Sequence, residues 1–142
     1  MSVKLEQVKL LLRGIRTDND SCHQLHNLLK VQRLCMIRRA SDALLTANAQ
    51  IDQLYLALSL NARVRRETLL SLGVTADSVG IAQVFSWLPA VQKTAARQAW
   101  RQLEENIAAC KRYNEKNGEL LTRQHEFIQT FLGHETHFIY HP

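Results

Sequence analysis

Apolar residues recur every three or four positions along almost the whole chain, which is the spacing of one face of an α-helix. The first stretches with this spacing are residues 3–37 and 42–72, and Gly73 follows the second as a typical helix C-cap. Five weak helix formers, residues 17–21, interrupt the first stretch. We therefore expect a long amphipathic helix that kinks or frays locally at these five residues.

Residues 3–72 fit either one helix or a hairpin of two. A single helix of this length would extend about 105 Å and leave much of its apolar stripe in water. A hairpin is more economical, and its best turn lies at residues 38–42. There Ser41 is expected to be the N-cap of the second helix, with Asp42 placed favourably in its first turn.

The chain after Gly73 predicts a short helix of about residues 80–88 and a long one of about residues 90–132. Pro89 suits the start of the long helix. Phe85 and Trp87 are expected to anchor the connection to the core, because aromatic side chains usually bury.

The sequence thus predicts an all-α fold, an elongated antiparallel helical bundle or coiled coil of three long helices and a short connecting helix. The expected domain is residues 1–133. Residues 134–142 are expected to form a flexible C-terminal tail.

The C-terminal part of the last helix carries a broad apolar arc. Its members, which span about 140° of the helix, are Tyr113, Leu120, Leu121, Phe127, Ile128, Phe131 and Leu132. Asn117 and Gln124 lie near the middle of the arc. A helix that only covers its own core needs about 100°, so the excess suits a partner, although broad arcs also occur on central helices of bundles.

Asn114, Asn117 and Gly118 are weak helix formers inside this strong helix, each less favourable than Ala by several tenths to about 1 kcal/mol. Such residues can fix the register of a seam, admit a close neighbour or contact another chain. The sequence leaves these alternatives open.

Composition agrees with a helical protein outside the membrane. The chain is 46% hydrophobic with only 5 Gly and 2 Pro. No apolar run approaches the ~20 residues that span a bilayer, and charges interrupt the N-terminal segment, so neither stable membrane insertion nor a signal peptide is expected. Cys22, Cys35 and Cys110 lack framework spacing, and we expect buried free thiols in a cytoplasmic protein.

The net charge of +5 raises the question of nucleic-acid binding. The densest basic groups are Arg38–Arg39 and a second group of Arg63, Arg65 and Arg66. Neither has interleaved aromatic residues, so no nucleic-acid partner is expected.

Metal, cofactor and catalytic sites are not expected either. His134, His137 and His141 would share a helical face, as would Cys22 and His26, but no Glu-x-x-His pair accompanies them. The sequence has no G-x-S-x-G turn and no phosphate-binding Gly-rich loop. These patterns favour a protein that is not an enzyme.

Residues 111–132 resemble the C-terminal segment of the FlgN-type flagellar export chaperones. The matching positions are Asn114, Asn117, Gly118, Leu120, Leu121, Gln124, Phe127 and Ile128. A second match, to the end of the preceding helix, comprises Arg66, Leu69, Leu70, Leu72 and Gly73, and a looser third match covers residues 24–33. Members of this family are more often acidic, so the resemblance does not explain the basic charge.

The resemblance implies a cytoplasmic type III secretion chaperone that binds the terminal helical segments of hook–filament junction proteins. It would prevent their premature association and deliver them to the export gate and its ATPase components. The client-binding residues expected on this basis are Asn114, Asn117, Gly118, Leu120, Leu121, Gln124, Phe127, Ile128 and Phe131. Tyr140, after Ile139, resembles the family's export-gate contact. The same apolar face can form a homodimer when client is absent.

The alternative is a homo-oligomeric coiled-coil adaptor or structural protein without a role in secretion, in which the apolar arc buries itself against a second copy.

Overall fold

The computed structural model describes residues 2–131, apart from the side chains of Ser2, Phe127 and Phe131. Its elements are α1 (Ser2–Arg38), α2 (Ser41–Ser71), α3 (Ser78–Ser86) and α4 (Ala90–Phe131). No strand occurs within residues 2–131. The predicted all-α fold is confirmed.

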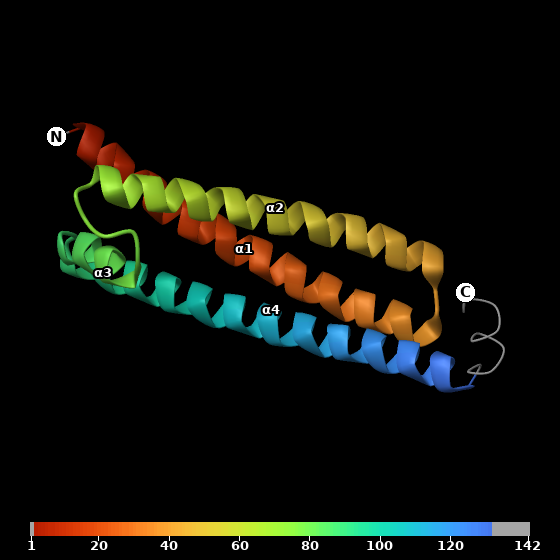
Figure 1. Ribbon diagram of the computed structural model, residues 1–142. Coiled ribbons are helices and arrows are strands. Elements are labelled where there is room, and N and C mark those ends of the chain that lie inside the picture. The colour runs from red at the N-terminus through yellow and green to blue at the C-terminus, as the bar shows by residue number, and fades with distance from the viewer. Residues whose placement is uncertain (1, 132–142) are drawn as a thin grey trace, which may run out of the picture.

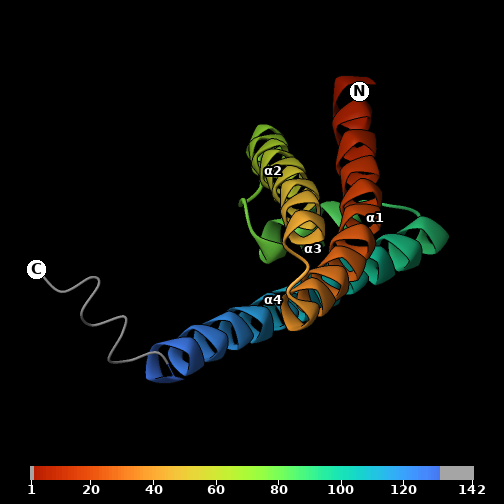
Figure 2. The ribbon, with the colours of Figure 1, turned by 90° about the vertical axis from the view of Figure 1, so that its right-hand side faces the viewer.

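The three long helices lie side by side in an elongated bundle, and α3 covers the end where α1 begins (Figure 1). Helix α1 packs along both α2 and α4, whereas α2 and α4 touch each other only sparsely. Figure 2 shows the same arrangement from the end of the bundle. Helix α1 is therefore the central helix, and α2 runs antiparallel to it while α4 runs parallel.

Buried positions on α1 follow an alternating spacing of three and four residues, the heptad pattern of a coiled coil. From Val8 to Leu29 they are Val8, Leu11, Ile15, Asp18, Cys22, Leu25 and Leu29, and Cys35 and Met36 are buried near the end of the helix. On α4 every seventh residue is buried, namely Ala96, Leu103, Cys110 and Asn117. Hydrogen bonds join residues 88 positions apart: Cys110 to Cys22, Asn117 to Leu29 and Gln124 to Met36. One constant register thus holds α4 against α1.

Two backbone hydrogen bonds close the turn between α1 and α2. Arg39 N donates to Met36 O (3.3 Å), and Ala40 N donates to Cys35 O (2.9 Å). This is the Schellman arrangement, whose left-handed residue is usually Gly. Here it is Arg39, with φ of 54°. The predicted Ser41 N-cap is wrong: Ala40 takes that position, and its methyl side chain cannot cap.

Residues 17–21 do not fray, since α1 is continuous through them. Their polar side chains instead make tertiary contacts. Asp18 is buried and bonds α2, while Asn19 donates to the carbonyl of Ala99 on α4 (3.1 Å). The cost of weak helix formers is offset by hydrogen bonds to two neighbouring helices.

At the other end of α2, Gly73 has φ of 84° and completes a second Schellman turn, in which Val74 N bonds Leu69 O (3.1 Å). Asp77 caps α3 by accepting from Gly80 N (3.0 Å). A Cβ on Gly80 would meet the carbonyl oxygen of Thr75, so only glycine fits there. Two hydrogen bonds hold the pKa of Asp77 below its usual value. The bond from the Thr75 hydroxyl has the larger effect, and the bond from Gly80 N has the smaller one.

Phe85 anchors α3 in the core, as predicted, with about 1% of its surface exposed. Trp87 does not. It is 42% exposed, and the ammonium of Lys4 lies 4.1 Å from its ring centroid. The helix therefore needs one aromatic anchor at this point, and the second ring takes a cation–π contact at the surface.

Candidate functional site

Because α2 and α4 scarcely touch, a groove runs between them with α1 as its floor. We call this the α2–α4 groove. Its middle part is a cleft of about 420 Å³, with walls formed from Tyr55, Leu58 and Ala62 on α2 and Ile107, Lys111 and Asn114 on α4. A second cleft of about 360 Å³ opens near the α1–α2 turn, where Leu44 faces Leu121 and Ile128 across Met36.

The floor of the middle cleft holds a buried ion pair. Arg65 on α2 donates to the carboxylate of Asp18 on α1 (2.7 Å), and the Asn61 amide donates to the other carboxylate oxygen (2.9 Å). The Arg65 guanidinium also lies 5.3 Å from the ring centroid of Trp100 on α4. A single charged group on α1 thereby connects all three long helices under the groove.

One α4 stripe faces the groove at intervals of seven residues: Ile107, Asn114, Leu121 and Ile128. The three apolar members are 40–57% exposed. Large aliphatic side chains that repeat at heptad spacing and remain half in water are typical of a helix whose partner is absent.

Gly118 lies on this stripe between Asn114 and Leu121. A Cβ placed on it would have no described atom within 4 Å. The packing of the bundle therefore does not require glycine at this position. The absence of a side chain lets another chain approach the α4 backbone closely.

Asn117 is buried beneath the groove rather than exposed in it. Its amide donates to the carbonyl of Leu29 (2.8 Å) and to the Gln32 side chain (3.0 Å), and it accepts from Arg33 (3.4 Å). Gln124, one heptad later, donates to the carbonyl of Met36 (3.1 Å). These two amides fix the register of α4 on α1.

The remaining predicted client-contact residues fall into two groups. Leu120 is half-buried on α4. The side chains of Phe127 and Phe131, together with Tyr140 and the histidines of the tail, lie outside the described part of the chain.

The three cysteines are buried free thiols, as predicted. Cys110 donates to the carbonyl of Cys22 (3.4 Å). The hydrogen bond with the Cys110 thiol, followed by burial, raises the pKa of Cys22 above its ordinary value. Cys22 therefore stays protonated at neutral pH and serves as a core residue.

His26, considered with Cys22 as a ligand pair, instead lies edge-on to the ring of Tyr113 with centroids 5.4 Å apart. Among the described residues, no three His, Cys, Asp or Glu side chains gather as a metal site would require. Within the same residues, no helix is both long and apolar enough to cross a membrane.

The α2 wall of the groove was not identified from sequence. Leu58 and Ala62 belong to the apolar stripe of residues 42–72, so periodicity assigns them to the core, and Tyr55 lies beside that stripe. The one available signal was the breadth of that stripe, since Tyr55 lies next to the Leu54 and Leu58 positions of the seam.

The fold is an elongated helical bundle with an open groove between two of its long helices. The FlgN family model, described as "FlgN protein", matches residues 1–133. The chain therefore belongs to the FlgN family, a family of flagellar export chaperones. No curated protein sequence and no solved structure matches it significantly.

Proposed function

We propose that this chain is a cytoplasmic flagellar export chaperone whose α2–α4 groove binds the terminal helical segments of hook–filament junction proteins. The observation that supports this most is the half-exposed stripe of Ile107, Leu121 and Ile128 along a groove that its own helices leave open. Family membership supplies the class of client.

The dimensions suit a helix. From Ile107 to Ile128 the stripe extends about 32 Å, at 1.5 Å per residue. An amphipathic client helix laid between α2 and α4 would complete a four-helix bundle and bury one apolar residue per heptad layer. Each such residue contributes about 1.5–3 kcal/mol of burial free energy, and part of the total is lost in ordering the client.

The middle of the stripe supplies specificity. Asn114 places an amide between two apolar layers, and Gly118 leaves room for the client backbone. A client with a polar residue opposite Asn114 is favoured over one that is apolar throughout, because an unpaired buried amide is costly.

In this proposal Asn117 and Gln124 support the groove through α1, while Leu121, Ile128, Asn114 and Gly118 face the client. Contacts from Leu120, Phe127 and Phe131 stay predictions.

Co-elution with the C-terminal helical segment of a hook–filament junction protein tests the proposal. Leu121→Asp and Ile128→Asp should abolish the complex, because each places a charge on the apolar stripe. Leu56→Asp is the matched control, since Leu56 is as exposed as Leu121 and does not line the groove. Circular dichroism must show that all variants fold. A complex that survives both groove variants would refute the site.

Export-gate delivery is tested separately at Tyr140. Tyr140→Ala should leave client co-elution intact and reduce secretion of the client. An equal loss of binding and secretion would refute a separate gate contact.

The groove also allows a homodimer when client is absent. In that case the mass of the protein in solution should rise with its concentration. Addition of a junction protein should change the mass to that of one chain plus one client. A dimer that persists, with no complex formed by any junction protein, would instead favour a coiled-coil adaptor.

A further inference from the structure

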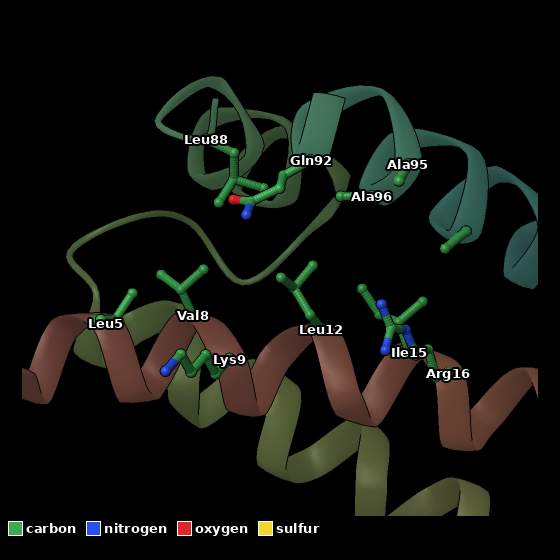
Figure 3. A pocket seen from close by; sticks show the side chains of 11 residues that line it. Leu5, Val8, Lys9, Leu12, Ile15, Arg16, Leu88, Gln92, Ala95 and Ala96 are labelled. Carbon is green, nitrogen blue, oxygen red and sulfur yellow. The ribbon is translucent and has the colours of Figure 1, made fainter. Parts of the chain in front are cut away.

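A third cleft, which is not part of the α2–α4 groove, lies on the other side of the α1–α4 seam. Figure 3 shows Val8 of α1 pointing toward Leu88 and Gln92, and Leu12 pointing toward Ala96 of α4. Its volume is about 300 Å³. We call it the α1–α4 cleft.

The cleft exists because three of the four residues that α4 contributes are alanines, the fourth being Gln92. Ala95, Ala96 and Ala99 are too small to fill the space opposite the leucines of α1. Leu88 bounds one end. At the other end Asn19 bridges the helices, donating to Ala99 O and accepting from Asn106 (3.1 Å each). From Leu5 to Arg16 the cleft is about 17 Å long, or three helical turns.

The rim of the cleft is basic. Lys9 and Arg16 line it, and no carboxylate does so among the described side chains. Glu6 lies 3.7 Å from Lys9, but both side chains are more than half exposed, so this pair neutralises the rim only weakly.

The charge that lines the cleft comes from Lys9 and Arg16, which lie seven residues apart on one face of α1. Residues 2–19 and 74–106, which reach the Asn19–Asn106 bridge at the end of the cleft, carry seven Lys or Arg and five Asp or Glu, a net charge of +2. An apolar cleft with cations along one rim attracts an apolar surface that carries negative charge along one flank.

We propose that the α1–α4 cleft docks an amphipathic helix of another protein, about three turns long, with small or aliphatic residues at spacings of three and four and Asp or Glu along the flank that faces α1. The aliphatic side chains enter the space left by the alanines, and the carboxylates pair with Lys9 and Arg16. Because the client stripe begins at Ile107 on the opposite flank of α4, the protein can hold this second helix and its client together.

The lining favours a protein helix over nucleic acid or lipid. Binding of single-stranded nucleic acid relies on aromatic rings for stacking, and no aromatic residue lines the cleft. A membrane surface favours an apolar face that protrudes, whereas these leucines lie in a concave site.

The probe is a labelled 18-residue helical peptide with leucines at spacings of three and four and glutamates along one flank of the leucine stripe. Its control has every glutamate replaced by lysine. Fluorescence anisotropy with the full chain should show binding of the glutamate peptide that weakens as salt rises, and about tenfold or weaker binding of the lysine peptide.

Two variants place the peptide in the cleft. Ala95→Leu should abolish binding, because an exposed position gains a side chain that fills the cleft. Lys9→Glu with Arg16→Glu should also abolish it. The matched control, Lys30→Glu with Arg112→Glu, makes the same charge change outside the cleft and should retain binding.

Equal binding of both peptides, or unchanged binding to Ala95→Leu, would overturn the proposal. So would tight binding of an RNA oligomer or anionic vesicles that the Lys9 and Arg16 changes remove, with no binding of either peptide. Leu121→Asp must still bind the glutamate peptide, and Ala95→Leu must still co-elute with the client. Loss of both ligands in either folded variant would refute two independent surfaces.

Discussion

The two halves of the bundle use the same heptad positions with different chemistry. In the near half, where α1 begins and α3 caps the end, the α4 seam is Ala96 and Leu103, and Ile81 and Phe85 complete an apolar core. In the far half, the same seam is Asn117 and Gln124, which bond carbonyls of α1. Apolar layers stabilise in proportion to buried area, whereas amide layers mainly select a register.

This difference relates stability to binding. The near half buries Ile81, Phe85 and Leu103 almost completely. The far half has no counterpart of α3 in the described part of the chain, and Leu121 and Ile128 are exposed there. An apolar seam there would slide or self-associate more readily, while the amides keep α4 in place and its outer stripe free.

The largest expected effect is the loss of the buried charge pair. Asp18→Ala leaves Arg65 without its partner under the groove and should lower the free energy of unfolding by about 3–5 kcal/mol. Urea denaturation measures this change.

Asp18→Leu combined with Arg65→Met should recover most of that loss, because two apolar residues replace the pair without leaving a charge unpaired. If Asp18→Ala alone lowers the free energy of unfolding by only about 0–1 kcal/mol, as the loss of an exposed ion pair does, the Asp18–Arg65 contact does not hold α1 and α2 together as the structure indicates.

A change to the amide seam should have a smaller effect. Asn117→Ala removes three hydrogen bonds in a buried layer and should cost about 1–3 kcal/mol in denaturant unfolding. Asn114→Ala, three residues earlier and exposed, should stay within about 0.5 kcal/mol of the parent. Equal costs at both positions would contradict the contrast between seam and groove.

The layer between the two halves, Cys22 with Cys110, predicts a dependence on pH. The hydrogen bond with Cys110, together with burial, raises the pKa of Cys22 in the folded state, so the contribution of Cys22 is fully present below the unfolded thiol's value of about 8.5. The same hydrogen bond lowers the pKa of Cys110, which opposes part of this dependence. Above that pH the unfolded chain loses the proton first, so stability should fall by at most about 1.4 kcal/mol per pH unit. Stability curves of parent and Cys22→Ala, measured from pH 7 to 10, should diverge, and parallel curves would oppose this explanation.

The smallest effect is expected at the far tip. Arg39→Gly should raise stability by about 1 kcal/mol, because a non-glycine residue at φ of 54° is strained. Arg38→Gly, one residue earlier in the helix, should lower stability by a similar amount. Thermal unfolding of the two variants should therefore shift in opposite directions.

Much of the fold could be predicted from the sequence. Long stretches with apolar spacing of three and four gave helices close to those observed, because that spacing is a local property of the chain. Errors arose where a local preference met a tertiary contact. Residues 17–21 are weak helix formers that stay helical because Asp18 and Asn19 bond neighbouring helices, and Trp87 is exposed because Phe85 already fills the core.

The candidate site could be predicted only in part. Leu121 and Ile128 were chosen from the breadth of the arc, and the structure places both beside the groove. The α2 wall and the α1–α4 cleft could not be found this way. Both depend on which helices fail to touch and on where alanines face leucines, and neither depends on spacing along one helix.

The sequence by itself determined the helices, their apolar faces and the resemblance to the FlgN family, since each is written in the order of neighbouring residues. Tertiary structure decided what each polar residue does. Asn114 and Asn117 share one short motif, yet the 88-residue offset between α1 and α4 buries Asn117 against Leu29 and leaves Asn114 at the groove. The reason is physical: three residues along a helix turn a side chain by about 300°, and only the position of the neighbouring helix determines which direction is inside.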